Sequence, residues 1–268
     1  MDKDSSKLKR LKKIIKRLGS IVVAYSGGLD STFLLKATLD TLGRKNVLAV
    51  TARSETYPES EYLCALKMAK KFKARHITID TKELGIKNFR ANPVNRCYYC
   101  KKELFRKLKE IAKRNGIKNV ADGANHNDLK DIRYGMKAAR ELGVVSPLLE
   151  ARIGKALIRK YSRKMGLATW SKPSFACLAS RFPYSENIDE AGLLKIDRAE
   201  EYLRKLGIKQ VRVRVHKDIA RIETYKGDIP KALKHRASIV KYLKSLGFIY
   251  ITLDLEGYRT GSMHEPLK

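Results

Sequence analysis

The 268-residue sequence lacks several features that mark particular classes of protein. It contains no run of about 18 apolar residues, so we expect no membrane-spanning helix. The N-terminus, Met1-Asp2-Lys3-Asp4, is charged and lacks the apolar core of a signal peptide. The four cysteines are not expected to form structural disulfides in a chain of this kind. We therefore predict a cytoplasmic protein without a membrane partner.

Acidic residues are also scarce. The chain has 28 Asp and Glu against 58 Lys and Arg, which gives a formal net charge of +30. Such a charge attracts nucleic acids and small polyanions. Lysine enrichment is also typical of proteins from organisms that grow at high temperature, and Gln210 is the only glutamine, which favours this second explanation. Composition alone leaves both explanations open.

A glycine-rich turn follows the first apolar segment. Residues 21–24 are typical of a buried parallel strand, and residues 33–39 carry apolar side chains at helical spacing. The N-terminus of a helix offers unpaired N–H groups and a positive dipole end, so the turn between these segments is suited to phosphate. The residues expected to bind the phosphates, directly or in the case of Asp30 through Mg²⁺, are Ser26, Gly27, Gly28, Asp30, Ser31 and Thr32.

The spacing of this turn differs from that of two common nucleotide motifs. It lacks the lysine of a Walker A loop and the third glycine of a dinucleotide fingerprint. Ser-Gly-Gly-x-Asp-Ser after an N-terminal strand resembles the pyrophosphate loop of the ATP pyrophosphatases. This resemblance implies ATP as the ligand, and Asp30 is expected to hold Mg²⁺ on the phosphates.

Strands and helices alternate after this turn. Residues 47–51 and 75–79 are predicted strands, separated by predicted helices, and residues 119–123 and 144–148 are further strand candidates. The pattern predicts an α/β domain with a doubly wound parallel sheet. Ligands then bind at the carboxyl ends of the strands, and we expect the adenine near Ser54. Residues 80–96 are predicted to be a loop that leads to a helix at 101–115.

The last third of the chain has a different pattern. A helix–Gly–strand unit at residues 202–215 recurs at 242–253, with a further strand near 219–223. We infer a smaller C-terminal α+β domain that serves substrate binding or oligomerisation. The predicted divisions are a nucleotide domain at 1–170, a functional linker at 171–185 and the C-terminal domain at 186–268.

Three cysteines are candidates for sulfur or metal chemistry. Cys97 and Cys100 form a C-x-x-C pair before a helix, which suits a redox pair, half a zinc site or two iron–sulfur ligands. Cys177 is the other cysteine predicted in a loop, whereas Cys64 is expected in the core. Three thiolates would leave one iron of a [4Fe-4S] cluster open to sulfide.

Arginines and glutamates form the last candidate group. Arg212 and Arg214 alternate with valines on a predicted strand, and Arg181 follows Cys177 by four residues. Together they suit a pocket for phosphate, although a solvated strand face has the same pattern. Glu200 and Glu223 suit either a divalent ion or, as we favour, ion pairs with lysines.

Three longer stretches add to the glycine-rich turn. They are Asp122-Gly123 with Asp128, Asp131 and Arg133-Tyr134-Gly135, then residues 172–184 (KPSFACLASRFPY) and residues 211–223 (VRVRVHKDIARIE). With them, the chain resembles the LarE family of ATP-dependent sulfur transferases over nearly its whole length. The turn is shared with many relatives, whereas the last two stretches are more specific.

The resemblance implies a reaction. The enzyme would adenylate a carboxylate of a pyridinium biscarboxylic acid mononucleotide and convert it to a thiocarboxylate, on the way to a nickel-pincer cofactor. Some members give up the sulfur of a cysteine matching the Cys177 region, and others have three cysteines and are thought to hold a [4Fe-4S] cluster. Cys97 and Cys100 place this chain with the second group, and Asp30 and Cys177 are the expected catalytic residues.

The resemblance also implies ligands and partners. Acidic residues matching Glu200 and Glu223 hold a divalent metal in the family, and Asp228 is the nearest candidate for the third acid. We expect a sulfide donor as a partner and a homo-oligomeric assembly.

Other classes of function remain as alternatives. A tRNA thiolation enzyme also combines this loop with a C-x-x-C pair and a third cysteine, and the net charge favours it, but no separate RNA-binding domain is evident. Another alternative is a nucleotide-sensing module, which would bind ATP without releasing pyrophosphate. Within the sulfur transferases, Cys177 as a sacrificial donor is the alternative to the cluster.

Overall fold

The computed structural model describes residues 3–130, 134–173, 176–259, 261–262 and 265. The chain forms two compact units. The N-terminal unit consists of residues 1–82 and 95–175, and the C-terminal unit of residues 83–94 and 176–268. Residues 83–94 therefore belong to the C-terminal unit although the chain then returns to the N-terminal one. None of the helices within the described ranges has the length and apolarity needed to cross a bilayer.

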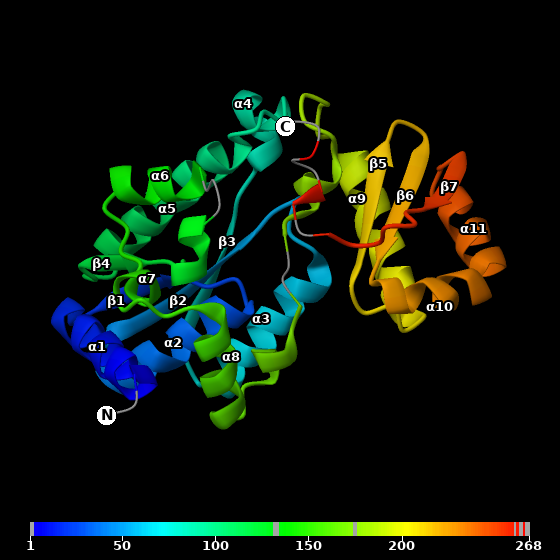
Figure 1. The fold of residues 1–268 in the computed structure, drawn as a ribbon. Coiled ribbons are helices and arrows are strands. Elements are labelled where there is room, and N and C mark those ends of the chain that lie inside the picture. Colours follow the sequence, from blue (N-terminus) through cyan, green and yellow to red (C-terminus); the bar gives the residue numbers. More distant parts are fainter. Residues whose placement is uncertain (1–2, 131–133, 174–175, 260, 263–264, 266–268) are drawn as a thin grey trace. The chain divides into compact units, whose positions relative to one another are not determined.

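The N-terminal unit is built on a parallel sheet (Figure 1). Its strands are β1 (Ile21–Ala24), β2 (Val47–Arg53), β3 (Arg75–Asp80) and β4 (Asn119–Ala121), in the order β3-β2-β1-β4. Ile21 of β1 lies opposite both Val47 and Asn119. Strands β2 and β3 lie on one side of β1, and β4 lies on its other side, so the strand order reverses between β1 and β4. This reversal is typical of a doubly wound sheet, and the prediction is confirmed.

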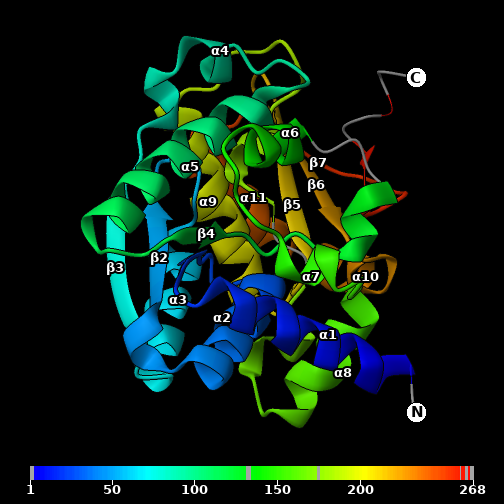
Figure 2. The same cartoon turned by 90° about the vertical axis from the view of Figure 1, so that its left-hand side faces the viewer.

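Helices cover both faces of this sheet (Figures 1 and 2). On one face lie α1 (Lys3–Leu18), α2 (Leu29–Leu42), α3 (Glu59–Lys71), α7 (Pro147–Glu150) and α8 (Lys155–Lys164). On the other lie α5 (Arg96–Arg114) and α6 (Tyr134–Glu141). Strand residues alternate between the two cores, because successive side chains of a strand point to opposite faces.

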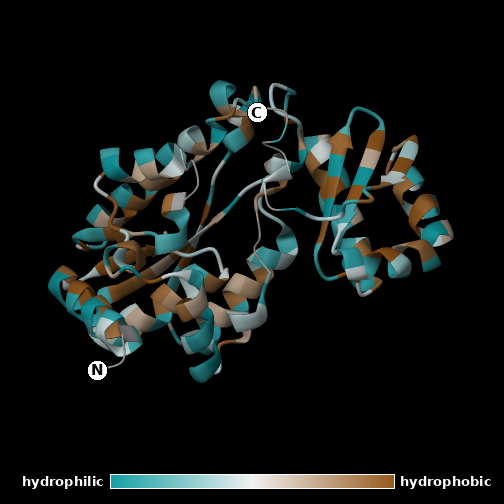
Figure 3. Cartoon of the chain, in the orientation of Figure 1, coloured by the Kyte–Doolittle hydropathy of each residue, from teal (hydrophilic) through white to brown (hydrophobic). Residues whose placement is uncertain are grey.

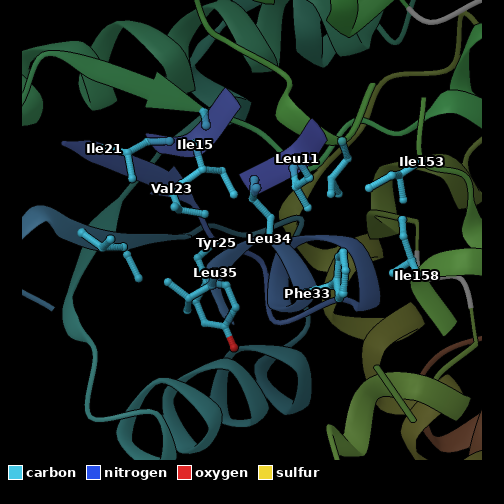
Figure 4. Close-up of a cluster of buried hydrophobic side chains, with 14 of the residues drawn as sticks. Leu11, Ile15, Ile21, Val23, Tyr25, Phe33, Leu34, Leu35, Ile153 and Ile158 are labelled. Atoms are coloured by element: carbon cyan, nitrogen blue, oxygen red, sulfur yellow. The ribbon is translucent and has the colours of Figure 1, made fainter. Parts of the chain in front are cut away.

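Neighbouring valines of β1 illustrate this alternation. Val23 packs in the cluster that contains Ile15 and Leu34, whereas Val22 packs in the cluster that contains Phe105 and Leu108. Figure 4 shows the side chains of α1, β1 and α2 pointing toward one another in the first cluster. The two apolar layers fix β1 and α2, and with them the turn that joins them.

The C-terminal unit contains a three-stranded sheet in the order β5-β6-β7. Its strands are β5 (Val211–His216), β6 (Ile219–Thr224) and β7 (Tyr250–Leu253), and its longer helices are α9 (Glu190–Lys205), α10 (Ile229–Lys234) and α11 (Arg236–Ser245). Strand β6 pairs antiparallel with β5 and parallel with β7. Hydropathy alternates along β5 and β6 (Figure 3), because one face joins the core with α9 and α11. The predicted smaller α+β fold is confirmed.

The short element α4 (Lys87–Arg90) is tied to this unit. The Asn92 side chain donates a 2.6 Å hydrogen bond to the Pro183 carbonyl, and the Ile188 N–H donates to the Arg90 carbonyl at 2.9 Å. The segment predicted as a loop at 80–96 therefore contains a helical turn with tertiary contacts.

Two other expectations were wrong. Residues 144–148 form no strand: Val145 makes a single parallel bridge with Ala121, and Pro147, which has no N–H to donate to a sheet, begins α7. Helix α5 begins at Arg96 rather than near residue 101, because residues 96–100 contain neither glycine nor proline to delay it. Cys97 and Cys100 consequently lie at the N-terminal end of this helix, about one turn apart.

Truncation of Leu34 to alanine tests the apolar layer beneath the turn. Leu34 is fully buried, so Leu34→Ala should lower the free energy of unfolding by about 2–5 kcal/mol, as measured by urea denaturation. The matched control is Leu63→Ala in α3, where the side chain is 55% exposed and the change should stay within about 0.5 kcal/mol. Equal losses in the two variants would contradict the assigned packing.

Candidate active site

The glycine-rich turn lies at the carboxyl end of β1, beside the point where the strand order reverses. Gly28 immediately precedes α2 in an extended conformation, and no side chain caps the helix. The N–H groups of Leu29, Asp30 and Ser31 therefore have no acceptor within the helix. In an open α/β sheet this is the position at which ligands bind. The turn thus presents backbone N–H donors and a positive dipole end to an anion.

Hydroxyl groups stabilise the shape of this turn. The Ser26 N–H donates to Ser31 Oγ at 3.3 Å, and the two serine hydroxyls lie 3.1 Å apart. Ser31 Oγ also donates to the Gly28 carbonyl at 3.3 Å. From outside the turn, the Tyr57 hydroxyl donates a 2.7 Å hydrogen bond to the Ser26 carbonyl. Burial is the main cause that raises the pKa of Tyr57, so this phenol remains a donor near neutral pH.

Glycine is required at position 27. Its φ is +60°, and a Cβ built there would lie 2.7 Å from Ala65 Cβ and 2.8 Å from Ala65 Cα of α3. The loop after β4 also approaches closely, since a Cβ at Gly123 would lie 3.1 Å from the Ser31 nitrogen. The start of α2 is therefore enclosed by backbone on two sides.

Polar residues after β4 contact the start of α2. The Asn125 side chain is buried and donates to Asp30 Oδ2 at 3.3 Å, while its own N–H donates to Asp128 Oδ2 at 3.0 Å. Asp122 Oδ1 accepts a 2.6 Å hydrogen bond from the Ser146 hydroxyl. Sequence reasoning assigned no role to Asn125, although it lies in the polar segment that follows the strand.

Two motif residues after this loop, Asp131 and Arg133, lie outside the described residues, as do residues 174–175.

A lysine that sequence reasoning left without a role lies beside the turn. Lys172 Nζ forms an ion pair with Glu61 at 2.7 Å and lies 3.4 Å from the Gly27 carbonyl. It also lies 3.6 Å from the sulfur of Cys64, which is half-buried rather than fully within the core. The ion pair holds a cation at the edge of the phosphate turn.

The end of β2 carries the residue predicted to contact adenine. Ser54 Oγ lies 3.2 Å from Thr56 Oγ1. The preceding Arg53 pairs with Glu59 at 3.3 Å and stacks over the Tyr62 ring. Ser54 thus lies at a carboxyl strand end of the same sheet as the phosphate turn.

The cysteines occupy two different settings. Cys97 is exposed and Cys100 half-buried, and their i, i+3 spacing in α5 places both on one side of its first turn. Cys177 is half-buried and belongs to the C-terminal unit, where it precedes the 3₁₀ turn Leu178–Arg181. Across the described residues, no group of three or more His, Cys, Asp or Glu side chains is gathered as a metal site.

The three candidate arginines are buried. Arg181 is fully buried, and Arg212 and Arg214 are each only 5% exposed, so a solvated strand face is excluded. Arg181 forms a two-point ion pair with Glu200 at 2.8 and 2.9 Å. Arg214 pairs with Glu223 at 2.8 Å.

Glu200 has a full set of partners. Besides Arg181, it accepts from Arg204 at 2.6 Å and from the Val213 N–H at 3.1 Å. Burial alone would raise the pKa of Glu200, but the charge and hydrogen bonds of Arg181, with Arg212 and Arg204, bring it below the ordinary value. The Glu200 carboxylate is therefore ionised, and its oxygens accept hydrogen bonds from Arg181 and Arg204.

Glu223 is engaged in the same way. It accepts from Arg214, from Arg221 at 3.2 Å and from the Ser262 hydroxyl at 3.2 Å. Asp228 lies at the start of α10, and no metal site includes it among the described residues. The three acids do not fit a divalent-ion site, and ion pairing, with arginines rather than lysines, is the arrangement that the structure shows.

Arg212 and Arg214 are the buried cations that a phosphate group would complement. Burial, and then the charge of Arg181, lowers the pKa of Arg212 to about 10, and its guanidinium lies 5.4 Å from the centre of the Tyr258 ring. The Nε of Arg214 is buried without a hydrogen-bond partner in the described part of the chain. Both groups would gain from an anionic ligand.

Substitution of Gly27 tests the phosphate turn. Gly27→Ala should abolish ATP binding in equilibrium dialysis, because the added Cβ displaces α3 or the loop. Gly19→Ala is the control: its φ is +69°, but no atom lies within 4 Å of an added Cβ. It should lower stability by about 1–2 kcal/mol and leave ATP affinity unchanged. Unimpaired ATP binding by Gly27→Ala would contradict the assignment.

Comparisons with known proteins agree with this geometry. The family described as "Arginosuccinate synthase N-terminal HUP domain" matches residues 20–168. An uncharacterised Synechocystis protein is 42% identical over 264 residues, covering 98% of each chain. Pyridinium-3,5-bisthiocarboxylic acid mononucleotide synthase of Lactiplantibacillus plantarum is 40% identical over 253 residues, covering 94% of this chain and 92% of the relative.

More distant relatives match only part of the chain. Argininosuccinate synthase of Archaeoglobus fulgidus is 29% identical over 167 residues, which cover 57% of this chain and 42% of that enzyme. The phosphate turn and its sheet are thus shared widely, whereas the whole-length matches include the cysteine and arginine segments. The chain belongs to the LarE family of ATP-dependent sulfur transferases, within the enzymes that use a pyrophosphate loop.

Proposed function

We propose that this protein uses ATP to replace a carboxylate oxygen of a pyridinium biscarboxylic acid mononucleotide with sulfur. The observation that carries the proposal is the phosphate turn at the N-terminus of α2, held by Ser26, Ser31 and Gly27 where the strand order reverses. The name of the Lactiplantibacillus relative gives a pyridinium bisthiocarboxylic acid mononucleotide as its product, and the corresponding biscarboxylic acid is the substrate that sulfur insertion would need. The product would then mature into a nickel-pincer cofactor.

The first step is activation of the carboxylate. A carboxylate is a poor electrophile because its leaving group would be oxide. Attack of a carboxylate oxygen on the α-phosphorus of ATP releases pyrophosphate and gives an acyl-adenylate, whose leaving group is AMP. The N–H groups at the start of α2 stabilise the departing pyrophosphate. Mg²⁺, held with Asp30, would supply Lewis-acid stabilisation of the same charge.

The second step is transfer of sulfur. A sulfur nucleophile attacks the acyl carbon, and AMP departs. We propose that Cys97, Cys100 and Cys177 hold a [4Fe-4S] cluster, which would supply iron-bound sulfide. The i, i+3 spacing of the first two on one turn of α5 supports their role as a ligand pair. Without a cluster, Cys177 would donate its own sulfur.

Arg212 and Arg214 are the proposed ligands of the substrate phosphate. The unpaired Nε of Arg214 and the buried charge of Arg212 support this role. Arg181 forms hydrogen bonds through all three guanidinium nitrogens, so we leave it out of the phosphate site. The C-terminal unit would then bind the substrate, with a separate sulfide donor and a homo-oligomeric assembly as further proposals.

Pyrophosphate release tests the activation step. With Mg²⁺ and ATP, the purified protein should form pyrophosphate and AMP in equal amounts only when the pyridinium biscarboxylic acid mononucleotide is present. Nicotinamide mononucleotide, which carries an amide in place of a carboxylate, is the matched control and should give none. ATP binding without turnover would favour a nucleotide-sensing module, and turnover that depends on tRNA would favour tRNA thiolation.

Iron and sulfide analysis tests the cluster. After anaerobic purification, wild type should contain about four iron atoms per chain. Cys97→Ala, Cys100→Ala and Cys177→Ala should each lose most of this iron. Cys64→Ala should retain it, since that cysteine lies beside Lys172 instead. Equal iron in all five proteins would contradict the cluster, and loss of one sulfur from Cys177 during turnover would then identify a sacrificial donor.

A further inference from the structure

The segment that carries Cys177 is anchored by a fully buried arginine. Transfer of a guanidinium from water into a protein interior is costly unless every donor finds a partner. Arg181 meets this condition within the C-terminal unit: Nε and one Nη donate to the two oxygens of Glu200 at 2.8 and 2.9 Å. Its other Nη faces the backbone before the 3₁₀ turn.

That second Nη contacts the main chain on both sides of the cysteine. It donates to the Ala176 carbonyl at 2.6 Å and to the Cys177 carbonyl at 2.9 Å, and it lies 2.9 Å from Ser180 Oγ. Fixing these two carbonyls fixes both peptide planes that flank Cys177, whose φ is −56° and ψ 151°. Only rotation about the Cα–Cβ bond then remains for the thiol.

Glu200, which accepts the two hydrogen bonds from Arg181, is itself bonded to the backbone of the sheet. Glu200 projects from α9 and accepts the Val213 N–H at the free edge of β5. At the far end of the same 3₁₀ turn, Arg214 donates to the Ser180 carbonyl at 2.7 Å and is held by Glu223. The secondary structure of the C-terminal unit is thus connected to the cysteine through two ion pairs.

We infer that Arg181 is a positioning residue for Cys177 and that Glu200 orients Arg181. A lysine could not replace it, because one ammonium cannot reach both carboxylate oxygens and two carbonyls. This assigns Glu200 a role other than metal ligand. The inference rests on the proposed function only in giving the Cys177 sulfur a part in catalysis, and displacement of a reacting group by about 1 Å can cost about 10²-fold in rate.

Three variants test this role. Arg181→Lys keeps the positive charge but loses the two parallel hydrogen bonds to the Glu200 carboxylate. Arg181→Met with Glu200→Gln removes both buried charges together, so neither is left uncompensated. Arg204→Lys is the matched control, because Arg204 also bonds Glu200, at 2.6 Å, and is partly exposed. Urea unfolding identifies which variants are folded.

The first measurement does not require turnover. The alkylation rate of Cys177 by iodoacetamide is compared with that of Cys64 in the same full-length protein after any bound iron has been removed by chelation, using peptide mass spectrometry. Both Arg181 variants should raise this ratio about tenfold, as expected for loss of a charge-assisted hydrogen bond, and Arg204→Lys should leave it unchanged. An unchanged ratio in a folded Arg181 variant, or an equal rise in Arg204→Lys, would overturn the inference.

The second measurement uses the reaction itself. In a single turnover, the rate of thiocarboxylate formation should fall about 10²-fold in the Arg181 variants, while pyrophosphate is released at the wild-type rate. A parallel fall in both products would indicate a purely structural effect and would overturn the positioning role. If wild type itself forms neither product, the proposed function fails, and the alkylation ratio still decides whether Arg181 fixes Cys177.

Discussion

The N-terminus of α2, directly after the glycine-rich turn, is the feature on which the proposed nucleotide chemistry depends. A helix cannot satisfy its first N–H donors internally, and β1 places those of α2 at the edge of the sheet where the strand order reverses, which is where ligands bind in open α/β sheets. The surrounding contacts serve this arrangement. Gly27 permits the close approach of α3, and the hydrogen-bonded hydroxyl groups of Ser26 and Ser31 connect the two sides of the turn.

The C-terminal unit solves a different physical problem. It buries arginines in a small domain, and it compensates the charges of Arg181 and Arg214 each with a glutamate and with backbone carbonyls. Because such pairs contribute little net stability, their geometric precision is the better explanation for their presence. In the proposed function, the N-terminal unit would activate the acyl group with ATP, and the C-terminal unit would hold Cys177 and the candidate phosphate ligands.

Much of the N-terminal unit could be predicted from local patterns. The β-branched runs at β1 and β2 and the helical spacing after the turn identified the parallel sheet, because burial on both faces leaves a continuous apolar signature. Val144 to Leu148 has a similar signature but ends in Pro147, which begins a helix, so apolar composition alone was misleading. The start of α5 was missed because the C-x-x-C spacing was interpreted as a loop.

The arginine contacts were harder to predict. Alternation along β5 correctly placed Arg212 and Arg214 on one face, but no local pattern reveals whether that face is covered. The partners of Arg181 and Arg214 come from α9, β6 and the segment before Leu178, and only the tertiary fold brings these together. Lys172 was missed for the same reason, since its partner Glu61 lies in α3.

The central claim is that carboxylate activation proceeds through an acyl-adenylate, and oxygen labelling tests it most directly. The substrate would carry ¹⁸O in both carboxylates, and AMP would be recovered after one turnover and weighed by mass spectrometry. When sulfur attacks the acyl carbon, the carbon–oxygen bond breaks and the bridging oxygen leaves with AMP. One ¹⁸O per AMP is the predicted result. Unlabelled AMP, formed together with thiocarboxylate, would contradict the account.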